Sequence, residues 1–113
     1  MSEYRINNII ENVSWIWEII HIEVEENTIK ISKKKLMRVR EASIFLKEYS
    51  KKYANGTIRK EDENHFLICL GVLIGIFKGT SLLKKNSRYK ALSRRINSLV
   101  KLFIGVNFGS LNL

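Results

Sequence analysis

The chain contains no proline and a single cysteine, Cys69, among its 113 residues. Proline ends helices and shapes loops, so its absence favours a few long helices joined by short connections. One cysteine excludes a disulfide within the chain and indicates a reducing compartment. The first residues place no basic segment before an apolar run, so no signal peptide is predicted. We therefore expect a cytoplasmic protein that folds as a single helical domain over residues 1–113.

A long hydrophobic run is also missing. The longest one, residues 66–77 (FLICLGVLIGIF), has His65 before it and Lys78 after it. A helix that crosses a bilayer needs about 20 apolar residues, so this run is too short to span one. A helix that is apolar on every side is typical of the central member of a small bundle. We expect a buried core helix here rather than membrane association.

Signals of catalysis or metal binding are few. His65 and Cys69 are four residues apart and share a helix face, but zinc needs three or four ligands and only His21 could join them. The spacing of Arg59 and His65 occurs in some helical ribonucleases, yet no other polar group accompanies this pair. The glycines form no phosphate-binding loop between a strand and a helix. We expect no enzyme, no cofactor, no metal and no small-molecule substrate, and we expect His65 to be a hydrogen-bonded core histidine beside a buried Cys69.

Apolar residues recur with the helical period in four segments. The segments run from about Ser2 to Glu26, from after Ser32 to Asn55-Gly56, from near Glu61-Asp62-Glu63 through the apolar run, and from Asn86 or Ser87 to Gly105. Their apolar faces comprise Ile6, Ile9, Ile10, Val13, Ile16, Trp17, Ile20 and Val24; Leu36, Val39, Ala42, Leu46, Tyr49 and Tyr53; and Tyr89, Leu92, Ile96, Leu99, Val100 and Phe103. An all-α, antiparallel four-helix bundle would bury all of these faces.

Small and aromatic residues add two expectations. Gly71, Gly75 and Gly79 are four apart and predict a flat ridge against which another helix packs closely. Trp15 and Trp17 point to different sides of the first helix, so we expect one of them to be exposed, as at a protein interface.

Negative charge is scarce beyond the first helix. Residues 1–29 hold six acidic residues and one basic residue, whereas residues 30–113 hold nineteen basic and five acidic residues. From Lys78 to the end there are eight basic residues and no acidic one. Such a division creates a directional field that attracts polyanions. The sequence therefore predicts an anionic partner.

Two helices offer rows of cations suited to phosphate contact. In the second helix the cations recur at spacings of seven, seven and four residues, and in the fourth they lie opposite or beside the apolar face. Lysine predominates and no RNA-reading aromatic motif is present, which indicates contact with the backbone rather than with bases. The predicted nucleic-acid-binding residues are Lys33, Arg40, Lys47, Lys51, Arg88, Lys90, Arg94 and Arg95.

The segments HFLICLGVLIGIFKG and RYKALSRRINSLVKLF, within residues 64–104, are similar to the helical C-terminal region of large subunits in CRISPR interference complexes of the Cascade type. In several such systems this region is also made separately as a small subunit. The resemblance implies a non-catalytic bundle that lines a ribonucleoprotein filament, packs on its own copies and supports the crRNA–target duplex or the displaced strand. The acidic first helix could then meet the basic face of the next copy.

A second hypothesis also fits this architecture. Immunity proteins of class IIa bacteriocins are basic cytoplasmic four-helix bundles of about this length, and they act at the membrane face of a sugar transporter. This resemblance lies in the overall architecture, because no motif of the chain carries it.

Overall fold

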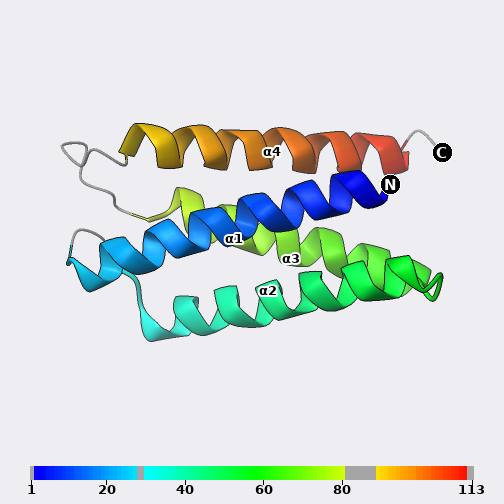
Figure 1. The fold of residues 1–113 in the computed structure, drawn as a ribbon, viewed down its shortest axis with the longest axis horizontal. Coiled ribbons are helices and arrows are strands. Elements are labelled where there is room, and N and C mark those ends of the chain that lie inside the picture. The colour runs from blue at the N-terminus through cyan, green and yellow to red at the C-terminus, as the bar shows by residue number, and fades with distance from the viewer. Residues whose placement is uncertain (1, 28–29, 81–88, 112–113) are drawn as a thin grey trace.

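The computed structural model describes residues 2–27, 30–80 and 89–111, and these residues form four helices and no strand (Figure 1). Side chains are described for the same ranges up to residue 105, except residue 89. The helices are α1 (Glu3–Glu25), α2 (Lys33–Ala54), α3 (Lys60–Lys78) and α4 (Tyr89–Leu111). The predicted all-α class is confirmed.

The four helices pack in a closed order. Helix α1 contacts α2 and α4, and α3 contacts the same two helices from the other side. In Figure 1, α4 lies at the top and α2 at the bottom, with α1 and α3 between them. The start of α1 and the end of α4 lie at one end of the molecule. As a result α2 and α4 occupy opposite corners of the bundle.

The predicted helix boundaries agree with the capping residues of α1 and α2. The hydroxyl of Ser2 accepts a hydrogen bond from the backbone N–H of Arg5 at 3.2 Å, and Ser32 accepts one from Lys35 at 3.2 Å. Each serine satisfies one of the backbone N–H groups left free at a helix start. Helix α2 ends before Gly56, whose φ of 69° is the left-handed conformation that glycine adopts at no steric cost.

The predicted end of the fourth helix is wrong. Helix α4 passes through Gly105 and continues to Leu111. A glycine inside a helix costs about 1 kcal/mol relative to alanine, which does not stop a helix whose preceding residues pack on the core. Leu102 and Phe103 provide such packing. The predicted start at Asn86 or Ser87 lies outside the described residues.

The core draws on all four helices and follows the predicted apolar faces. Those faces supply the buried residues Ile6, Ile9, Val13, Ile16, Ile20, Val39, Ala42, Leu46, Tyr49, Leu92, Ile96 and Leu99. Ile10, Trp17, Val24, Tyr53, Val100 and Phe103 are partly buried against the same core. Each fully buried large apolar side chain contributes about 1.5–3 kcal/mol relative to exposure.

Helix α3 is buried on one side only. Phe66, Leu70 and Leu73 are fully buried, but Ile68 is 65% exposed and Val72 is 39% exposed. The run is therefore a core helix, as expected, but it is not buried all round, because α3 packs against two neighbours and its outer side is left uncovered. No helix within the described residues has the length and hydropathy needed to cross a membrane.

The glycine and tryptophan expectations also need correction. Only Gly71 faces a neighbouring helix, with Phe103 Cζ 3.8 Å from the place a Cβ would take, whereas Gly75 has nothing within 4 Å. The predicted ridge is therefore not a helix contact along its length. Trp15 and Trp17 are both half-buried against the core, so neither is left exposed.

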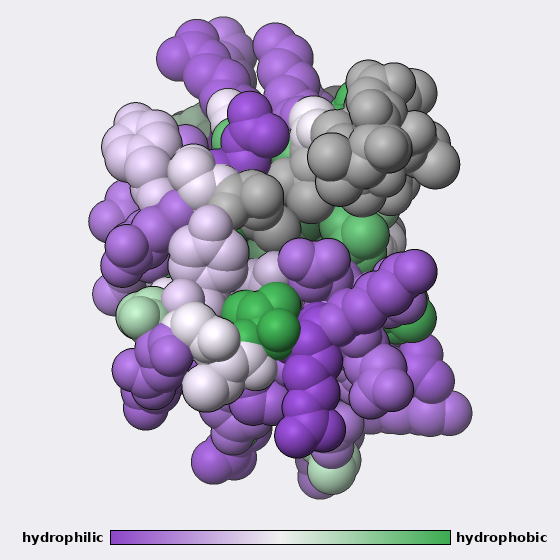
Figure 2. Space-filling view, turned by 90° about the vertical axis from the view of Figure 1, so that its right-hand side faces the viewer, coloured by the Kyte–Doolittle hydropathy of each residue, from purple (hydrophilic) through white to green (hydrophobic). Residues whose placement is uncertain are grey.

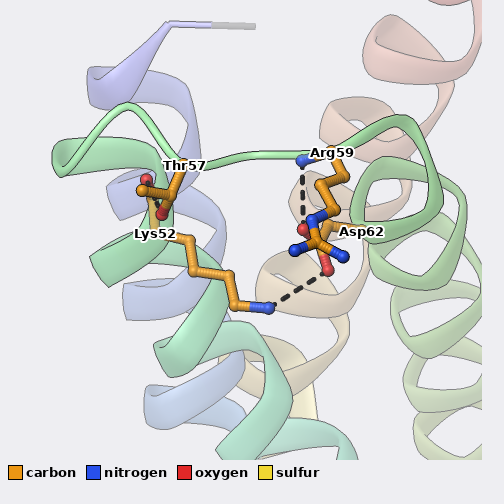
Figure 3. Close-up of polar contacts among 4 residues, drawn as sticks. All are labelled: Lys52, Thr57, Arg59 and Asp62. Carbon is orange, nitrogen blue, oxygen red and sulfur yellow. Dashed lines mark hydrogen bonds and ion pairs between the residues drawn. The ribbon is translucent and has the colours of Figure 1, made fainter.

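The connection between α2 and α3 is held by one carboxylate (Figure 3). Asp62 Oδ2 accepts the backbone N–H of Arg59 at 3.0 Å, and its Oδ1 accepts from Lys52 Nζ at 3.2 Å. The Thr57 hydroxyl donates to the carbonyl of Lys52 at 3.3 Å. The backbone hydrogen bond from Arg59, aided by the Lys52 ammonium, lowers the pKa of Asp62 below its ordinary value.

We expect Asp62→Ala to lower the melting temperature near neutral pH, because it removes the acceptor that joins α2 to the start of α3. The folded pKa of Asp62 is lowered, so its contribution is present above the unfolded value of 3.8 and is lost as the pH falls through the folded pKa. Glu61→Ala removes the same charge from the same helical turn and is the control. Thermal unfolding across acidic pH checks this. An equal effect of both variants, or a difference that does not shrink in acid, contradicts it.

Tyr49 carries an unpaired polar group into the core. Its ring stacks on Phe66 at a centroid distance of 4.4 Å and is 1% exposed, while its hydroxyl has no hydrogen-bond partner in the described structure. Burial, together with the Glu63 carboxylate, raises the pKa of Tyr49 to about 12. A buried hydroxyl without a partner costs about 1–3 kcal/mol of stability.

Tyr49→Phe is therefore expected to raise the free energy of unfolding by about 1 kcal/mol near neutral pH. The folded pKa of about 12 exceeds the ordinary 10.0, so the wild type loses stability as the pH rises through this range while the variant does not. The gap should widen by roughly 1 kcal/mol near pH ~11. Denaturant unfolding at both pH values measures it. Tyr4→Phe, at an 80% exposed tyrosine, should show neither effect, and a destabilised Tyr49→Phe would refute the argument.

Candidate nucleic-acid interface

The predicted cations of α2 lie together on its outer side. Lys33, Arg40, Lys47 and Lys51 are all exposed, and they share one side of the helix at spacings of seven, seven and four. This row, here called the α2 track, is roughly 27 Å long at 1.5 Å per residue. None of the four makes an ion pair within the part of the chain that the structure describes.

Two of the predicted cations of α4 form a second row together with Lys101, which was not among the predicted binding residues. Lys90 and Arg94 are exposed on the outer side of the helix, and Lys101 follows seven residues after Arg94. We call these three residues the α4 track. Arg88, also predicted, lies outside the described residues. Because α2 and α4 occupy opposite corners, the structure does not bring the two tracks onto one surface.

An acidic row separates the two tracks on the α1 side. Glu11, Glu18 and Glu25 recur every seven residues and are all exposed. Glu25 Oε1 also lies 3.2 Å from His21 Nε2, one turn earlier in the same helix. Since α1 packs between α2 and α4, a phosphate backbone that crossed from one track to the other would pass these carboxylates. The α2 track and the α4 track are therefore two separate cationic surfaces.

Arg95 differs from the other predicted cations. Its guanidinium lies over the ring of Trp15 at 4.9 Å, and its Nη1 donates to Asn12 Oδ1 at 3.4 Å. Both partners belong to α1. Arg95 is therefore on the side of α4 that faces α1, rather than in the α4 track.

Around Arg95 the two helices enclose an open hollow of about 430 Å³, here called the α1–α4 hollow. Its lining contains three cations and no carboxylate. The lining residues are Arg5, Asn8, Asn12, Arg95, Ser98, Lys101, Leu102 and Gly105. Figure 2 views the end of the molecule where α1 begins, and there hydrophilic side chains cover most of the coloured surface, with apolar atoms in small separate patches.

Sequence reasoning found only Arg95 among the residues of this hollow. Two signals were available in the first helix. Arg5 is its one cation among six acidic residues, and Asn12 interrupts the buried stripe next to Val13. Neither signal shows that Arg5 and Lys101 approach the same hollow, because that depends on how α1 packs against α4.

A second groove lies between α2 and α3 and is mainly apolar. It has a volume of about 260 Å³ and includes Phe45, His65, Ile68, Cys69 and Val72 in its lining. The His65 ring lies 4.1 Å from that of Phe45. Burial raises the pKa of the Cys69 thiol, which makes it a poor nucleophile at neutral pH.

The expected core position of His65 is wrong, whereas the expected burial of Cys69 is confirmed. His65 is exposed beside the groove, and His21 is exposed and paired with Glu25. His21 belongs to α1 while His65 and Cys69 belong to α3. In the described residues, no three side chains of the metal-ligating types come together to hold an ion.

Comparisons with known protein families, curated proteins and solved structures find no match for this chain. The resemblance to Cascade-type subunits therefore stays a prediction.

Proposed function

We propose that the protein binds the phosphate backbone of nucleic acid along α4, as a non-catalytic cytoplasmic subunit of a ribonucleoprotein assembly of the CRISPR interference type. The observation that carries this proposal is the cationic α4 side of the bundle. There the α4 track adjoins the α1–α4 hollow, whose lining holds no carboxylate. Unneutralised cations in a row suit a continuous phosphate chain, and binding releases its condensed counterions.

The proposal includes an antiparallel arrangement of successive helices. The five residues between α2 and α3, residues 55–59, support it, because so short a connection favours antiparallel neighbours. The start of α1 and the end of α4 at one end of the molecule support it further.

The second cationic surface suits a different contact. Lys33, Arg40 and Lys47 of the α2 track recur every seven residues, as do the three carboxylates on α1. At 1.5 Å per residue, both rows repeat about every 10.5 Å, so they can pair in register between two copies of the chain. Such a contact joins different surfaces of the two copies and can continue from copy to copy, as a filament requires.

Binding to the α4 surface predicts a selective loss on charge reversal. The double variant Lys90→Glu, Arg94→Glu should weaken binding of labelled single-stranded DNA and RNA and lower the slope of log affinity against log salt by about 1–2 units. The matched variant Lys33→Glu, Arg40→Glu changes the net charge equally on the opposite corner and should keep the wild-type slope. Fluorescence anisotropy across a salt series measures both. Equal losses would indicate only a net-charge effect, and no binding of the wild type near ~50 mM salt would contradict the proposal.

The copy-to-copy contact predicts a charge-swap rescue. Two triple variants, one with Glu11, Glu18 and Glu25 changed to Lys and one with Lys33, Arg40 and Lys47 changed to Glu, should each lose self-association. Their mixture should associate again, because the reversed α1 of one now faces the reversed α2 of the other. Sedimentation velocity at about 50 mM salt compares them. A wild type that stays monomeric near ~1 mM, or a mixture no more associated than its components, contradicts it.

The uncovered outer side of α3 favours a second candidate, the bacteriocin-immunity function. Ile68 and Val72 expose apolar surface beside the open backbone of Gly75. A patch of this kind suits a protein partner such as a transporter face. Failure of the wild type to bind either nucleic acid would favour this candidate.

A further inference from the structure

We propose that the α1–α4 hollow is a discrete binding site for one phosphate group, which shares only Lys101 with the α4 track. The hollow has room for a phosphate and the atoms joined to it, at about 430 Å³. This site does not depend on the proposed function, since a free phosphate compound and the terminal phosphate of a nucleic-acid strand offer the same chemistry.

The charge around the hollow points to an anion. Arg5 comes from the first turns of α1, while Arg95 and Lys101 come from α4. These three cations repel one another across a shared space that no carboxylate lines. A phosphate placed among them replaces this repulsion with charge-assisted hydrogen bonds, which are about twice as strong as neutral ones.

Arg95 is held in place for such a role. Its guanidinium rests on Trp15 and donates to Asn12, which is 5% exposed. Asn12 is itself held by α1, because its Nδ2 donates to the carbonyl of Asn8 at 2.8 Å and to Asn8 Oδ1 at 3.1 Å. A guanidinium has five N–H donors, so the bond to Asn12 leaves a planar fork for two oxygens of a phosphate.

Neutral donors complete the site. Since Asn8 Oδ1 already accepts from Asn12, the amide NH₂ of Asn8 remains as a donor. Ser98 adds a hydroxyl from α4. The lining contains no aromatic ring on which a base could stack, and Trp15 lies beneath Arg95 rather than in the lining. The site therefore recognises the phosphate and not a base.

Phosphate binding can be followed through Trp15, because an anion that engages Arg95 alters the cation over this ring. The Trp17→Phe variant keeps Trp15 as its remaining tryptophan. In this variant we expect titration with inorganic phosphate or pyrophosphate to change the fluorescence emission of Trp15 until it saturates. Lys101→Gln should weaken the affinity about tenfold, equivalent to about 1.4 kcal/mol. Lys60→Gln on α3 removes the same charge away from the hollow and is the matched control. Circular dichroism confirms that each variant is folded.

Two oligonucleotides of the same sequence, one with a 5′-phosphate and one with a 5′-hydroxyl, test whether the bound phosphate belongs to a strand end or to a free compound. Tighter binding of the phosphorylated strand that Lys101→Gln abolishes would support a strand end, and saturation by inorganic phosphate alone would support a free compound. The site would be overturned if phosphate and pyrophosphate gave no saturable response up to about 10 mM and the 5′-phosphate were not preferred. It would also be overturned if Lys101→Gln and Lys60→Gln lost equal affinity for phosphate. Backbone binding of the hydroxyl strand would survive that result, so the two proposals fail separately.

Discussion

Burial of one apolar stripe per helix against two neighbours is the constraint on which the rest of the structure depends. It produces a closed arrangement of helices, in which α1 and α3 each contact both α2 and α4. Among the side chains that the structure describes, nineteen apolar ones are buried in the resulting core, and each large one contributes on the order of 1.5–3 kcal/mol. The remaining faces of the helices must then point outwards at four corners. The positions of the two cationic tracks, the acidic row of α1 and the apolar strip of α3 are consequences of this closure.

The closure separates the two cationic tracks and brings together other charges that lie far apart in the sequence. The α2 and α4 tracks end on opposite corners, and the carboxylates of α1 stand between them on one side. Arg5 and Lys101 are 96 positions apart, yet they line one hollow. The field of this protein is thus organised in alternating strips rather than as one basic face. Such strips favour oriented contacts with several partners, including other copies of the chain.

The packing departs from an ideal apolar core in two ways: polar groups lie inside the core, and apolar side chains are left uncovered outside it. Tyr49 keeps a hydroxyl in the core without a partner, which is a cost that phenylalanine would avoid. Ile68 and Val72 leave an apolar strip on α3 that no other helix covers. Asn12 is polar and buried, but its hydrogen bonds are made to Asn8 and Arg95, so it positions a cation rather than weakening the core.

The sequence by itself determined the helices, their core-facing residues and most of their ends, because these follow from local rules. Ser2 and Ser32 cap helices wherever they lie, and a stripe such as Ile9, Val13 and Ile16 must be buried in any bundle. The tertiary structure alone decided which faces became neighbours. The helical period of one segment cannot show that α3 has an uncovered side, that Arg95 lies over Trp15, or that Arg5 and Lys101 line one hollow. Those outcomes depend on helix order and rotation, which are set by the fit of side chains between helices far apart in the chain.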